Sequence, residues 1–249
     1  MIIDSHCHAG AGFGLSDPWY GCPLLDSYLR RAAAAGITHS VLFANFHDDY
    51  AEANRIVAGL VGRNPRRFFG LAYVHAERDR GRIFQMVQTA VEEYGFVGMK
   101  VHRHDARITH EICEAARAFA LPVLYDVETE LRVLDGLARN FPDVAFIVPH
   151  LSSFAENWRA QTAFLDRLEA IPNLHTDTSG VRFFNLLERV VERCGPRKLL
   201  FGSDGPWLHP GVELAKVRAL GLPPPDERLV LGGNFLRLTG AVIETTEAL

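Results

Sequence analysis

The chain opens with Met1-Ile2-Ile3-Asp4-Ser5-His6-Cys7-His8, a short apolar run that leads directly into His-x-His. Side chains alternate between the two faces of a strand, so residues i and i+2 point the same way. His6 and His8 can therefore bind one ion together, whereas Cys7 faces the opposite side as a small buried residue. Paired histidines also occur as ordinary polar groups, so the rest of the chain has to decide between the two interpretations.

Seven further apolar runs follow, and a segment of helical periodicity separates each run from the next. The spacing is roughly 28 residues per unit, which is the size of a βα repeat. We expect strands at 1–8, 37–43, 68–75, 96–102, 121–126, 144–150, 171–177 and 198–204. We expect helices at 24–35, 50–62, 80–93, 107–119, 129–140, 155–168, 181–194, 211–220 and from 233 to the end.

This pattern predicts an α/β protein, a (β/α)8 TIM barrel in a single domain that spans residues 1–249. The runs are continuously apolar, as parallel strands covered on both faces are, whereas an antiparallel sheet would alternate. An open doubly wound sheet is the alternative, but no Gly-x-Gly-x-x-Gly turn follows the first run. The glycine-rich stretch 9–14 lacks the Lys-Ser/Thr ending of a phosphate loop, so we expect a mobile loop over the site there.

The composition favours a protein that acts on a small soluble ligand. Hydrophobic residues make up 48% of the chain, enough for one sizeable core. The formal net charge is −4 and the basic residues form no block, which argues against nucleic acid or a membrane surface as partner. No signal core or membrane-spanning run is present, so we expect a cytoplasmic protein. The four cysteines show no Cys-x-x-Cys spacing, which argues against a disulfide framework or a structural zinc site.

Polar residues capable of binding a metal follow several of the predicted strands. In a TIM barrel the carboxyl ends of all strands converge on one face, where the chemistry of the fold takes place. The residues that meet there are His6, His8, Lys100, Asp126, His150 and Asp204. Imidazoles and carboxylates are costly to bury unpaired, and a bound divalent ion accounts for all of them at once.

Six segments in register with this barrel resemble the amidohydrolase superfamily, within the branch of small barrels related to aminocarboxymuconate-semialdehyde decarboxylase and the amidohydrolase-2 lactonases. The segments are 3–8, 95–102, 121–124, 146–150, 201–207 and 230–234. The resemblance implies a divalent metal held by His6, His8 and Asp204. We expect one ion, zinc, with manganese or iron as alternatives.

One position departs from this family. The family places a histidine ligand at the end of the fifth strand, where this chain has Asp126. Aspartate can still bind zinc through oxygen. Lys100 on the adjacent strand offers two other arrangements: a plain ion pair with Asp126, or a carboxylated lysine that bridges two metals. We favour one ion and the Lys100–Asp126 ion pair.

Four further residues are candidates for substrate binding. His102 and His209 follow strand ends, and Arg103 and Arg182 lie in loops or first turns on the same side of the barrel. An arginine there could hold a substrate carboxylate with two hydrogen bonds. His175 lies within a predicted strand, and we interpret it as structural.

The resulting functional prediction is a metal-dependent hydrolase that directs an activated water at an amide, lactone or ester of a small, anionic or cyclic molecule. Asp204 would carry the proton of the attacking water, and His150 would orient the water or polarise the carbonyl. Non-oxidative decarboxylation of an unsaturated or aromatic acid is the alternative. A third hypothesis is a barrel that binds metal without turnover. The sequence leaves the oligomeric state open, a homodimer included.

Overall fold

Parallel strands close into a barrel in the computed structural model, which describes residues 1–12, 25–154 and 157–243. The described strands are β1 (Ile3–Ala9), β2 (His39–Ala44), β3 (Phe68–Gly70), β4 (Ala72–Tyr73), β5 (Met99–His102), β6 (Val123–Asp126), β7 (Phe146–Val148), β8 (Leu174–Asp177) and β9 (Leu199–Leu200). β3 and β4 are the two halves of one barrel strand, interrupted at Leu71. Each strand runs parallel to its neighbours.

Backbone hydrogen bonds close the ring where the strand ladders break. The amide of Leu71 donates to Leu42 O over 3.0 Å, which joins β2 to the interrupted third strand. On the other side, the amide of Ser5 donates to Phe201 O over 3.0 Å, and a parallel bridge pairs Cys7 with Gly205. The first and last strands are therefore neighbours, and the (β/α)8 TIM barrel predicted from the sequence is confirmed.

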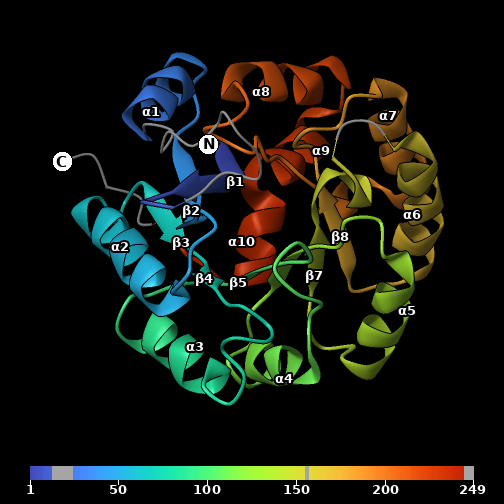
Figure 1. Ribbon diagram of the computed structural model, residues 1–249. Helices are drawn as coiled ribbons and strands as arrows, with labels where there is room; N and C mark the ends of the chain where they lie inside the picture. The colour runs from blue at the N-terminus through green and yellow to red at the C-terminus, as the bar shows by residue number, and fades with distance from the viewer. Residues whose placement is uncertain (13–24, 155–156, 244–249) are drawn as a thin grey trace.

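A ring of helices surrounds the strands in chain order (Figure 1). These are α1 (Leu25–Ala34), α2 (Tyr50–Arg63), α3 (Ile83–Glu92), α4 (His110–Ala118), α5 (Leu131–Asn140), α6 (Trp158–Ala170), α7 (Phe184–Cys194) and α8 (Pro210–Ala219). Each buries an apolar side against the barrel, as Val57 and Val61 do for α2. The Asp49 carboxylate accepts from Ala51 N and caps the start of α2. Among the described helices, none is long and apolar enough to cross a bilayer.

The C-terminal elements cover the amino ends of the strands. They are α9 (Pro224–Arg228), a π-helical turn η3 (Leu229–Gly233) and α10 (Asn234–Thr239), which lies at the centre of the ring in Figure 1. The Asn234 side chain donates to Leu199 O over 2.8 Å, and Gly232 lies so close to Ile3 that a β-carbon would stand 2.8 Å from its Cγ1. The opposite, carboxyl face of the barrel is left for the site.

Several predicted elements end earlier than expected. The sixth and eighth predicted strands stop at Val148 and Leu200. A short 3-10 turn η1 (Pro149–Ser152) follows β7, and a second 3-10 turn η2 (Pro196–Lys198) precedes β9. The expected C-terminal helix ends at Thr239 instead of continuing, because Gly240 adopts a left-handed φ of 68° that terminates it. Leu24, residues 13 and 14 of the expected loop, 155–156 and 244–249 lie outside the described residues.

Candidate metal centre

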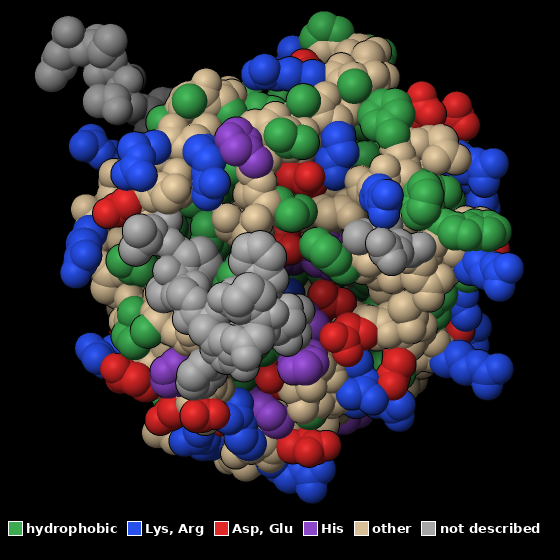
Figure 2. Space-filling model, turned by 45° about the horizontal axis from the view of Figure 1, so that its top comes forward, with side chains coloured by type: hydrophobic (Ala, Val, Ile, Leu, Met, Phe, Trp, Pro, Cys, Tyr) green, Lys and Arg blue, Asp and Glu red, His purple; other side chains and the backbone are tan. Residues whose placement is uncertain are grey.

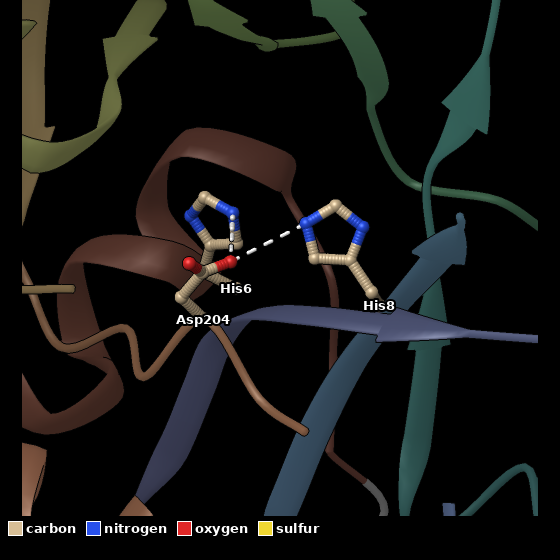
Figure 3. Close-up of side chains that lie close together, drawn as sticks. All are labelled: His6, His8 and Asp204. Carbon is tan, nitrogen blue, oxygen red and sulfur yellow. Dashed lines mark ion pairs between the residues drawn. The ribbon is translucent and has the colours of Figure 1, made fainter. Parts of the chain in front are cut away.

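Three side chains converge at the carboxyl face of the barrel: His6 and His8 from β1, and Asp204 from the loop after β9 (Figure 3). Asp204 Oδ1 lies 3.4 Å from His6 Nε2 and 3.3 Å from His8 Nε2. One ligand atom from each residue lies within 4.8 Å of the others, and all three residues are buried. The alternation of β1 thus places both imidazoles on one side, as the spacing predicts.

The second ring nitrogen of each histidine is held by the protein. His6 Nδ1 donates to Asp177 Oδ2 over 2.7 Å, and His8 Nδ1 donates to Ala44 O over 3.3 Å. A neutral imidazole that donates from Nδ1 carries a lone pair on Nε2. Both lone pairs therefore face the carboxylate of Asp204. Metal-binding histidines are oriented in this way, so these donors fit a divalent ion.

A buried network fixes Asp204 in place. The Asp4 carboxylate accepts from Ser203 N over 2.8 Å and from Tyr28 Oη over 2.8 Å, which ties the chain before Asp204 to β1. Burial raises the pKa of Asp4 to about 6 despite these hydrogen bonds. Asp204 itself has a left-handed φ of 55°, a strained conformation that aims its side chain inward. Burial raises the pKa of Asp204, but its interactions with the nearby imidazoles of His8, His6 and His150 outweigh burial and lower the pKa well below its usual range.

His150 lies beside this group of three residues. Its ring centroid is 5.1 Å from that of His6, and its φ of 57° again turns a strand-end side chain towards the site. His150 Nδ1 donates to Ser179 O over 2.7 Å, so that Nε2 faces the Asp126 carboxylate at 3.6 Å. His150 is thus held next to the candidate metal ligands.

The sequence matches a family model described as amidohydrolase over residues 3–238. This chain belongs to the amidohydrolase family. The match spans nearly all of the chain and includes every residue of the group just described. No protein of curated function matches the sequence.

Solved structures that share this fold include decarboxylases and a probable hydrolase. They include 5-carboxyvanillate decarboxylase from Sphingomonas paucimobilis, with 15% identity, a TM-score of 0.75 and coverage of 97% of this chain and 99% of that chain. A dihydroxybenzoic acid decarboxylase from a Polaromonas species, with bound manganese and the inhibitor 2-nitroresorcinol, has 18% identity, a TM-score of 0.69 and 96% coverage of both chains. A probable 2-pyrone-4,6-dicarboxylic acid hydrolase from Acinetobacter baumannii, with citric acid bound, has 16% identity, a TM-score of 0.73 and coverage of 96% and 99%. Identities this low establish the TIM-barrel fold alone.

In this amidohydrolase the expected Lys100–Asp126 ion pair does not form. Asp126 Oδ2 instead lies 3.2 Å from His102 Nε2, because the β5–β6 register places His102 directly opposite Asp126 and Lys100 opposite Leu124. His102 Nδ1 accepts from His104 N over 3.0 Å, so a neutral His102 carries its proton on Nε2 and donates to Asp126. Burial raises the pKa of Asp126, but the charges of His102, His150 and Lys100 outweigh burial and hold it well below its usual range.

Lys100 is fully buried, and its Nζ has no hydrogen-bond partner among the described residues. The ammonium lies 5.1 Å from the centre of the Phe43 ring, which also contacts the rings of His6 and His8. Burial lowers the pKa of Lys100, and the carboxylates of Asp126, Asp204 and Asp177 counteract this effect from a distance. Neither Lys100 nor Asp126 belongs to the group of three potential metal ligands.

The predicted substrate-binding residues take different positions. His102 lies at the site, bound to Asp126. Arg103 forms an ion pair with Glu130, in which Nη2 lies 2.7 Å from Oε1, so its guanidinium binds a side chain of the protein itself. His209 is exposed and caps α8, where its Nδ1 accepts from Gly211 N, and Arg182 is exposed in the loop after β8.

A cavity of about 370 Å³ lies on the same face, where the loops after β2, β4 and β5 meet. It is lined by Phe46, His47, Asp48, His75, Arg78, His104 and Asp105. The Phe46 ring stands between this cavity and the centre, with its centroid 4.9 Å from that of His102. Histidine and acidic side chains gather around the hollow of this face (Figure 2). The volume is in the range of small-molecule sites.

Sequence reasoning missed Asp177 and Ser179. Asp177 is fully buried at the end of β8 and holds His6, and Ser179 holds His150. Asp177 ends a predicted strand, so the strand-end rule that selected Asp126 and Asp204 could have found it. Ser179 offers no such signal, since its role depends on how the loop after β8 folds back.

Proposed function

We propose that this amidohydrolase is a metal-dependent hydrolase that cleaves a carbonyl-type bond, an amide, lactone or ester, in a small anionic or cyclic molecule. The group formed by His6, His8 and Asp204 supports the proposal. Catalytic zinc sites use three protein ligands and keep a fourth position open for water or substrate. Two imidazoles and one carboxylate favour zinc, and a single ion uses all three.

A bound zinc ion would supply Lewis-acid chemistry, lowering the pKa of water from 15.7 towards about 7 and polarising a carbonyl oxygen. Side chains of the protein would accept and deliver the proton of the attacking water. Asp204 faces both histidines with Oδ1, which leaves Oδ2 to accept the proton of the attacking water and to deliver it to the leaving group. His150 would orient the attacking water, which would donate to its Nε2, since its Nδ1 donates to Ser179 O.

Decarboxylation is the second candidate, and the decarboxylases that share this fold favour it. The bond between the carboxyl carbon and its neighbour would break, carbon dioxide would leave, and the electron pair would stay on the remaining carbon. That carbon would take a proton from Asp204 or His150, which lie at the same site. The same residues thus serve both reactions, and only the products distinguish them.

Metal analysis followed by a product assay tests the proposal. Purified protein should contain about one zinc ion per chain, and a panel of lactones, amides, esters and aromatic acids should show release of acid without carbon dioxide. Release of carbon dioxide from an aromatic or unsaturated acid would identify a decarboxylase instead. Metal binding without turnover of either kind would favour a barrel that has lost catalysis, and protein that binds no metal would contradict all three.

A further inference from the structure

An ion pair on the outer helix α8 contacts the loop that follows β8. Lys216 Nζ lies 2.7 Å from Glu213 Oε2 and donates to Thr178 O over 3.0 Å and to Val181 O over 2.9 Å. An ammonium has three N–H donors, so all of them are engaged. Glu213 Oε2 also accepts from Gly180 N over 3.0 Å. Both ends of the loop 178–181 and its middle are thus bound to α8.

The same loop holds His150 from its inner side. Ser179 O accepts from His150 Nδ1 over 2.7 Å, and Ser179 Oγ lies 3.0 Å from the same nitrogen. Ser179 Oγ donates to Asp177 Oδ1 over 2.5 Å and lies 3.3 Å from His6 Nδ1, while Asp177 Oδ2 lies closer to that nitrogen, at 2.7 Å. The orientation of His150 therefore depends on the position of the loop, whereas the shortest hydrogen bond of His6 Nδ1 is to a residue of β8 itself.

The fit between this loop and His150 leaves little room. Gly180 has a left-handed φ of 60°, and a β-carbon there would stand 3.2 Å from His150 Nδ1 and 2.6 Å from Phe154 Cε2. A small displacement of the loop would consequently break the hydrogen bond from His150 Nδ1 to Ser179 O. Without that bond, the proton of a neutral imidazole is free to move to Nε2, which removes the lone pair on the side of the site.

Stability alone gives a weak reason for this ion pair. Glu213 is 7% exposed, and a largely buried pair gains little net stability because both charges lose their hydration. The pair binds backbone atoms of Thr178, Gly180 and Val181, and these contacts set the position of the loop. We propose that the Glu213–Lys216 pair of α8 is a positioning element that fixes the tautomer and orientation of His150 through the loop 178–181. The inference rests on the proposed function only for the catalytic role of His150.

Nitrogen-15 NMR of histidine-labelled, metal-free protein tests this inference without substrate. At alkaline pH, where the histidine rings are neutral, His150 in the wild type should show a protonated Nδ1 and an unprotonated Nε2, with its signals assigned by a His150→Gln variant. In Lys216→Met the two ring nitrogens should move towards the averaged shifts of a mixture of tautomers, while His6 keeps its protonated Nδ1. The NMR experiment needs neither metal nor turnover, so it tests this inference separately from the proposed function. A turnover assay with a known substrate would test the proposed function.

Arg167→Met is the matched control. Arg167 also pairs with a carboxylate, Asp135, and also donates to a backbone carbonyl, Ala163 O, but it does so between α5 and α6. Its removal should leave the His150 signals unchanged. If Lys216→Met does not fold, Glu213→Gln/Lys216→Met removes the pair without leaving a buried unpaired charge and should show the same averaging. Wild-type His150 signals in a folded Lys216→Met or double variant would overturn the inference, as would an equal change in Arg167→Met.

Discussion

His6 Nδ1 donates to Asp177 Oδ2 over 2.7 Å, a hydrogen bond between residues 171 positions apart in the sequence. It joins the first strand of the barrel to the penultimate one and sets which nitrogen of His6 faces Asp204. The candidate metal centre therefore depends on a residue that does not itself belong to the ligand group.

Replacing Asp177 with asparagine should weaken metal binding while the three ligand residues remain. The amide that replaces the carboxylate holds the His6 ring less firmly, and such supporting residues typically contribute about 10–100-fold to metal affinity. Competition with a chelator on the purified Asp177→Asn variant measures the effect. Unchanged affinity in a folded variant would show that the His6–Asp177 bond does not orient the ligand.

The His6→Ala/His8→Ala variant should lose most bound metal and stay folded, because the apolar core supplies the stability of the barrel. Metal analysis with circular dichroism measures both outcomes. His110→Ala is a suitable control, since the His110 side chain is 72% exposed on α4. If the double variant retained one metal ion per chain, this assignment of the site would be wrong.

Asp204→Asn should lower turnover by roughly 10²–10⁴, the range for residues that transfer protons. Asparagine keeps a carbonyl oxygen near His6 and His8 but cannot accept the proton, so some metal should remain. Steady-state kinetics and metal analysis on the same preparation separate the two effects. Turnover near that of the wild type would contradict the proposed mechanism.

Lys100→Met should bind metal more tightly than the wild type. The buried ammonium lies on the Phe43 ring that also contacts both histidines, and its positive charge opposes that of a bound cation. In the buried interior, repulsion between the Lys100 ammonium and the bound cation should make metal affinity in the wild type lower than in the variant by a factor on the order of tenfold or more. Chelator competition should show this gain, and metal counting should give one ion per chain in both proteins. Two ions in the wild type and fewer in the variant would instead indicate a carboxylated lysine that bridges them.

The stability of the wild type should fall more steeply with acid than that of His175→Met. His175 is buried in β8, where burial lowers its pKa to about 3, so the folded protein resists protonation that the unfolded chain accepts below about 6.5. The stabilisation is complete above pH 6.5 and is lost as the pH falls towards 3. Between pH 7 and 5 the wild type should lose about 2 kcal/mol more unfolding free energy than the variant. Denaturant titrations at the two pH values measure this difference, and parallel losses would contradict it.

The sequence by itself determined the architecture and which strand-end residues gather at the candidate site. Eight apolar runs at a regular spacing are sufficient to predict the barrel, because parallel strands with both faces covered form nearly continuous apolar runs. The two-residue period of a strand likewise places His6 and His8 on one side without any knowledge of the rest. Asp204 follows from the same rule, since the carboxyl ends of all strands meet on one face.

The tertiary structure alone decided which polar residues pair with one another. Lys100 and His102 lie on the same face of β5 and both could reach Asp126, but the register of β5 on β6 sets His102 opposite it and leaves Lys100 opposite Leu124. The left-handed backbone of His150 and the folding of the loop 178–181 bring His150, Ser179 and Asp177 together. Register and loop conformation result from the packing of the whole barrel, so local sequence does not specify a partner that lies 29 positions away, as Ser179 does from His150.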